Sequence, residues 1–241
     1  MALFGWIKQK KSVQISVDNL ARCFDEYHKQ FSARKQKGLL FDKYSCTIES
    51  HKKTKHSDKY IKICMDDNLS DEQFKAVFDD LKSIFGNPQY VYDMTCFEWK
   101  ADEHYVRFGR IAVRYGLELP MIILTKESGD KKIEYTFYQQ VADAFLKAKI
   151  IKYDCLLTWF YDFGFTHINI DGDYVYHVDF CGDCISAKKT RLPTEQEKQE
   201  MFSADNVEKR KELNKKLVVF DKKEYTSVDK LAQVLCDMIE N

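Results

Sequence analysis

The sequence predicts an α+β fold, in which antiparallel strands form meanders and hairpins and helices pack mainly on one face. Three observations predict it. Short apolar segments separated by turn residues run from residue 89 to residue 137. Amphipathic helices, with apolar side chains at helical spacing, stand before and after these segments. The densest apolar and aromatic stretch, residues 156–185, is typical of a strand pair turning at Asp171-Gly172-Asp173.

The length of 241 residues suits either two small domains or one large domain. We expect an N-terminal α+β lobe over residues 1–128 and a C-terminal α+β lobe over residues 129–241, or else one continuous domain. Hydrophobic residues make up 44% of the chain, which is enough for a sizeable core, and only three Pro argue against long linkers.

The charges balance overall, but they are unevenly distributed along the chain. Residues 1–60 hold 13 Lys or Arg against 6 Asp or Glu, and the remainder is acidic. This asymmetry fits either a basic surface for an acidic partner or nucleic acid, or charges that average out in the fold. The chain has eight Cys, most of them within apolar patterns, and shows no signal peptide or transmembrane segment. These features predict a cytoplasmic protein without integral membrane association.

The first elements are a helix and two strands. Val17–Phe31 has apolar residues at helical spacing, and Leu40–Ser50 and Lys59–Met65 are rich in strand-forming residues. The hairpin tip between these strands is basic. It is either a solvated turn or a surface for an acidic or phosphate-bearing partner, and its candidate partner-binding residues are Lys52, Lys53 and Lys55.

The second helix has clear boundaries in the sequence. Ser70 and Gln73 form a capping box at its start, and Gly86 followed by Pro88 ends it. Its apolar stripe predicts core packing against the following meander, and consists of Phe74, Val77, Phe78, Leu81 and Phe85.

The remaining elements follow in order. The meander strands are Thr95–Lys100, Tyr105–Tyr115, Pro120–Lys126 and Lys132–Phe137, and Gly109 suggests a bulge. After the meander we expect a helix at Tyr138–Ala148, and Tyr153–Phe163 either extends this helix or forms a fourth one. The central hairpin follows, and after it a charged helical segment at Thr194–Lys216 that is interrupted near residues 203–206. The chain then forms a strand at Leu217–Phe220 and a closing helix at Thr226–Ile239.

The faces of the central hairpin depend on the length of its loop. A three-residue loop places Ile170 opposite Tyr174 and collects aliphatic and aromatic side chains on one face. Two-residue loops at Asp171-Gly172 or Gly172-Asp173 mix His or Asn with aliphatic residues on both faces. We therefore predict the three-residue loop.

In that register one face of the hairpin carries a mixed polar set. His167 and His177 would be cross-strand neighbours, with Asp179 and Cys181 on the same face. Nitrogen, carboxylate and thiolate ligands together suit zinc or another transition metal. The alternative is a solvated or partner-contacting face, and Phe165 opposite Asp179 argues against the site.

The lone Cys181-Gly182-Asp183-Cys184 motif lacks the second ligand pair of a structural zinc site, and the residues after it form a poor helix for a thiol-redox centre. Phosphate-binding loops, dinucleotide fingerprints, nucleophile elbows and HExxH helices are also absent from the sequence. We therefore expect a non-catalytic cytosolic binding protein of inhibitor, immunity or adaptor type, with another protein as its partner. The alternatives are a metal- or thiol-dependent enzyme using the hairpin face, and nucleic-acid binding through the basic N-terminal quarter.

Overall fold

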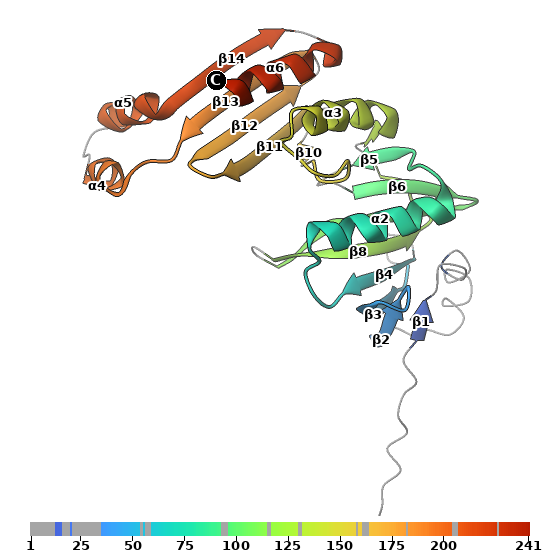
Figure 1. The fold of residues 1–241 in the computed structure, drawn as a ribbon. Coiled ribbons are helices and arrows are strands. Elements are labelled where there is room, and N and C mark those ends of the chain that lie inside the picture. The colour runs from blue at the N-terminus through green and yellow to red at the C-terminus, as the bar shows by residue number, and fades with distance from the viewer. Residues whose placement is uncertain are drawn as a thin grey trace, which may run out of the picture. The chain divides into compact units, whose positions relative to one another are not determined.

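The computed structural model describes residues 13–15, 20, 35–53, 55, 59–92, 96–114, 117–129, 132–157, 159–160, 164–181, 183–203, 207–225 and 227–241. The chain divides into two compact units, Met1–Pro88 with Cys96–Ser128, and Gln89–Thr95 with Gly129–Asn241. The short segment Gln89–Thr95 therefore belongs to the second unit, although the sequence placed it in the N-terminal lobe. Both units mix antiparallel strands with helices, which confirms the α+β fold class (Figure 1).

The first unit contains a sheet whose neighbours are antiparallel except for the parallel pair β1 and β2. Its strands, in spatial order, are β1 (Val13–Ile15), β2 (Gln36–Leu40), β3 (Tyr44–His51), β4 (Tyr60–Met65), β8 (Leu117–Thr125), β7 (His104–Arg114) and β6 (Cys96–Ala101).

Helix α2 (Asp71–Phe85) covers one face of this sheet, and the predicted capping box at its start is present (Figure 1). The Ser70 side chain accepts a hydrogen bond from the Gln73 amide, and the Gln73 side chain accepts one from the Ser70 amide. Phe78 packs on Phe97 and Trp99 of β6, with ring centroids 4.5 and 5.9 Å apart. The predicted stripe is buried at Phe74, Val77, Phe78 and Leu81, whereas Phe85 is only partly buried.

This packing predicts that Phe78→Ala lowers the free energy of unfolding by about 3–5 kcal/mol, because the ring leaves a cavity against the meander. Phe85→Ala is the matched control, since its partly exposed ring should contribute less. Urea unfolding followed by circular dichroism measures both. A loss below about 1 kcal/mol for Phe78→Ala would show that this ring is not part of the core.

The second unit contains a short antiparallel pair, β5 (Tyr90–Tyr92) with β9 (Lys132–Glu134), and a five-stranded antiparallel sheet. Two helices, α3 (Tyr135–Lys147) and α6 (Val228–Glu240), lie side by side on this sheet (Figure 1). The five strands, in spatial order, are β10 (Trp159–Phe160), β11 (Gly164–Asp171), β12 (Tyr174–Cys181), β13 (Cys184–Arg191) and β14 (Val218–Tyr225).

Aromatic side chains fill the space between α3 and the sheet. The Tyr138 ring lies 5.8 Å from that of Phe165, and the Phe137 ring lies 6.0 Å from that of Phe180. Helix α6 adds a second apolar stripe, whose buried members are Leu231, Val234, Leu235 and Met238. We call this helix-covered side of the sheet the covered face.

Several predicted elements differ from the structure. Tyr135 already begins α3, so the expected strand Lys132–Phe137 is only β9. The expected helix at Tyr153–Phe163 contains β10 instead, and none of its described residues is helical. Strand β2 was missed, because a turn at Phe41–Lys43 separates it from β3. The helix expected at Val17–Phe31 lies outside the described residues, except for Leu20.

The charged segment between β13 and β14 is confirmed as helical on both sides of residues 204–206, which lie outside the described residues, so the predicted interruption there is not tested. It forms α4 (Glu195–Ser203) and α5 (Val207–Leu217), and its side chains are mostly exposed. The closing helix is also confirmed as α6. These two predictions rested on local signals, namely cap residues and helical spacing.

The predicted register of the central hairpin is wrong. Asp171 pairs with Tyr174 across the two-residue loop Gly172-Asp173, and Ile170 pairs with Val175 rather than with Tyr174. Gly172 has a φ of 55°, which glycine adopts at little energetic cost. In this register Phe165 lies opposite Phe180, so both rings face α3, whereas the predicted register would have placed Phe165 opposite Asp179. Burying two aromatic rings stabilises the fold more than placing Ile168 and Ile170 on the covered face would.

Candidate functional site

The register separates the four residues that the sequence grouped as a metal site. His167 pairs with Val178 on the covered face, whereas His177 pairs with Ile168 on the opposite face. Asp179 lies on the same face as His177, and the side chain of Cys181 lies outside the described part of the structure.

The two imidazole rings therefore point to opposite sides of the sheet, because directly paired residues share a face and successive residues alternate. Their ring nitrogens cannot converge on one zinc ion, and the ligand set that depended on the three-residue loop is not formed. Elsewhere among the described residues, His, Cys, Asp and Glu do not gather in groups of three that could hold a metal ion.

His167 is instead a core residue. It is 8% exposed, and its ring stands perpendicular to that of Phe145 with centroids 5.2 Å apart. Among the described residues, neither ring nitrogen has a hydrogen-bond partner. Burial lowers the pKa of His167 to about 4, because the apolar surroundings disfavour the charged imidazolium.

This burial makes the stability of the second unit depend on pH. Below pH 6.5 the unfolded chain binds a proton at His167, whereas the folded chain binds it only near pH 4. Stability therefore falls as the pH falls through this window. Between pH 7.5 and pH 5 the free energy of unfolding of the wild type should fall by about 2 kcal/mol more than that of His167→Phe. Urea unfolding at each pH measures both.

His177→Gln is the control for this prediction, because His177 is 43% exposed on the opposite face. It should keep the pH dependence of the wild type. If the free energy of unfolding depended on pH equally in the wild type and in His167→Phe, the imidazole at position 167 would not be buried in its neutral form.

The CxxC motif forms a hairpin turn. Cys181 pairs with Cys184 across β12 and β13, with only Gly182 and Asp183 between the strands. A thiol-redox centre of this spacing would start a helix, whose N-terminus lowers the thiol pKa. Cys184 is a free thiol and lies at the start of strand β13.

The lysines proposed for partner binding lie in the connection between β3 and β4. Lys52, Lys53 and Lys55 are all exposed, and the hairpin predicted around them is present. Part of its tip lies outside the described residues, so partner binding by these lysines stays a prediction.

The sheet surface opposite α3 and α6 is the strongest candidate for a functional surface. Ile168 and Ile170 are 60% and 66% exposed there, although the same strand buries Phe165 and His167 on its other side. Asp179 accepts a hydrogen bond from Thr166 and lies 3.4 Å from the Nε2 atom of His177. We call this surface the open face, made by Thr166, Ile168, Ile170, Val175, His177, Asp179, Ser186, Lys188 and Thr190.

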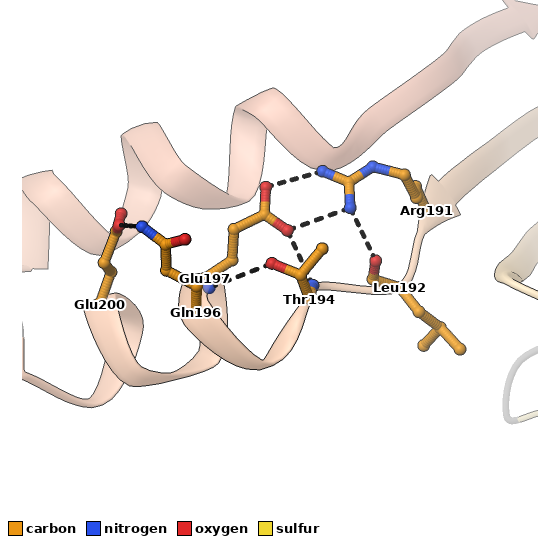
Figure 2. A network of polar contacts seen from close by, with 6 residues as sticks. All are labelled: Arg191, Leu192, Thr194, Gln196, Glu197 and Glu200. Carbon is orange, nitrogen blue, oxygen red and sulfur yellow. Dashed lines mark hydrogen bonds and ion pairs between the residues drawn. The ribbon is translucent and has the colours of Figure 1, made fainter.

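Beside the open face, a polar network fixes the direction in which the chain leaves β13. The guanidinium of Arg191 donates two hydrogen bonds to the carboxylate of Glu197, at 2.8 and 3.0 Å (Figure 2). Thr194 and Glu197 form a capping box at the start of α4. The hydrogen bonds from Arg191 and Thr194 lower the pKa of Glu197 to about 2.

Removing the guanidinium in Arg191→Gln should raise the pKa of Glu197 from about 2 toward the ordinary value of 4.5, since its strongest donor is lost. Titration of the side-chain carboxyl by NMR measures this change. Lys198→Gln is the matched control, because Lys198 pairs with Glu195 instead. A wild-type pKa near 4.5 would show that the network does not persist in solution.

Sequence reasoning missed the exposed isoleucines and the Arg191 network. The spacing Thr194-x-x-Glu197 is a visible capping-box signal. The predicted register places the apolar Phe165 opposite the charged Asp179, and this mismatch was a sign that the register was wrong. The alternation of aliphatic residues favoured that register nevertheless.

Comparison with family models, curated proteins and solved structures finds no match to this chain. Within the described residues, no helix is long and apolar enough to cross a membrane. The geometry of the open face is therefore the main evidence on function.

Proposed function

We propose that this chain is a non-catalytic binding protein of inhibitor, immunity or adaptor type, and that the open face contacts another protein. The observation that supports it is the pair Ile168 and Ile170, whose side chains are largely exposed on adjacent outward positions of β11. Neighbouring exposed aliphatic side chains on a sheet surface are favourable to bury in an interface, because water is released from apolar area.

The edge of β11 strengthens this proposal. Among the described residues, β10 pairs only with Gly164 and Phe165, and no described strand pairs with Thr166–Asp171 on that side. The opposite edge strand, β14, carries Asp221, Lys222, Lys223 and Glu224, which discourage pairing with another chain. The stretch from Thr166 to Ile170 contains no Lys, Asp or Glu. An extended segment of a partner could add to this edge and cover the isoleucines.

The alternatives have less support. The enzyme hypothesis needed His167 and His177 on one face, which the register does not provide. The nucleic-acid hypothesis rests on the basic N-terminal quarter, much of which lies outside the described residues. A cytoplasmic location remains part of our proposal, and the free thiols of the described cysteines are compatible with a reducing compartment.

The proposal predicts that Ile168→Glu/Ile170→Glu loses its partner, because two carboxylates would be buried in the interface. Cross-linked capture from extracts of the source cells, quantified by mass spectrometry, should show at least about a tenfold loss of the protein captured by wild type. The milder Ile168→Thr/Ile170→Thr pair keeps β-branched side chains and should also weaken capture.

Phe202→Glu is the matched control, because Phe202 is 87% exposed on α4 rather than on the open face. It should capture as much partner as wild type. Unchanged capture by both isoleucine variants, with circular dichroism showing an intact fold, would overturn the open face as the contact surface.

A further inference from the structure

An open hollow lies at one end of the open face, between the sheet and α5. It has a volume of about 600 Å³ and combines side chains of β13, α5 and β14. The residues lining it are Lys188, Lys211, Asn214, Lys215, Val218 and Asp221. Three ammonium groups therefore share the hollow with one carboxylate and one amide.

Two of these ammonium groups are available to a ligand. Within the described part of the chain, Lys188 and Lys215 have no ion pair or hydrogen bond, whereas Lys211 pairs with Glu208 at 2.8 Å. Unpaired ammonium groups that face a common space create a positive potential, which attracts a carboxylate most strongly at low salt.

Rows of cross-strand neighbours connect the hollow to the exposed isoleucines. One cross-strand row runs from Ile168 through His177 to Lys188 and Asp221. The next row runs from Ile170 through Val175 to Thr190 and Val218. The open face therefore changes from aliphatic at β11 to basic beside α5.

We propose that the hollow binds carboxylates of an acidic segment of the partner protein, whose aliphatic side chains cover Ile168 and Ile170. This inference rests on the proposed function and names the chemistry of the partner. Charge complementarity selects the segment, and burial of the isoleucines adds affinity.

A nucleic-acid backbone fits this surface less well. Its phosphates follow one another closely. Asp221 on the first row, and Asp179 on the neighbouring row of Thr166 and Ser186, would repel a continuous line of negative charge. Nucleic-acid strands are also bound by stacking successive bases on aromatic rings, whereas the eight residues of these two rows include one aromatic ring, that of His177. Carboxylates separated by aliphatic residues avoid both conflicts.

The test begins with selection of random displayed peptides of about twelve residues on the full chain. We expect the selected peptides to be rich in Asp and Glu next to Leu, Ile or Val. Fluorescence anisotropy then measures peptide binding to wild type and to Lys188→Gln/Lys215→Gln, which should bind about tenfold more weakly at low salt. High salt should reduce this difference, because the charges are screened.

Lys209→Gln/Lys216→Gln is the matched control, because it removes the same charge from α5 outside the hollow. It should bind the peptides nearly as wild type does. Circular dichroism confirms folding of each variant.

The outcomes separate the two proposals. Peptides that are not acidic, or that bind equally well after the Lys188→Gln/Lys215→Gln change, would overturn the inference even if Ile168→Glu/Ile170→Glu abolishes binding. Single-stranded RNA that binds more tightly than any peptide through the same lysines would also overturn it. Peptide binding that survives the isoleucine changes would overturn the proposed function itself.

Discussion

The second unit depends on one packing constraint, the burial of Phe165 and Phe180 beneath α3. The two rings lie directly opposite each other on β11 and β12, each 1% exposed, and contact Tyr138 and Phe137. Because side chains alternate between faces along a strand, fixing these two positions fixes the facing of every other residue in the hairpin. The aromatic contacts thus determine the register.

The same constraint creates the main functional features of the unit. It places His167 in the core, where no described residue forms a hydrogen bond with its ring, and it directs Ile168 and Ile170 outward. A buried unpaired imidazole is unfavourable, and exposed isoleucines gain nothing from folding. Both are tolerated because the aromatic core stabilises the register, and we propose that the outward isoleucines are retained for binding.

The sequence by itself determined the elements whose signals are local. The capping box at Ser70 and Gln73, the stop at Gly86 and the periodic apolar residues were enough to place α2 and most of its buried stripe. The α+β class, the charged helices α4 and α5, and α6 followed from similar patterns. Such signals act within a few residues of the chain, so no knowledge of the tertiary structure was needed.

Only the tertiary structure decided the register and therefore the candidate site. The sequence allowed two-residue and three-residue loops at Gly172, and the choice depended on whether α3 packs on Phe165 or on the isoleucines. The turn at Phe41 and Asp42, both with positive φ, also lacked a sequence signal, because Phe seldom adopts that conformation. The basic hollow joins Lys188 of β13 to Lys211 and Lys215 of α5. These residues are distant in sequence, and only the packing of α5 beside the sheet brings their charges together.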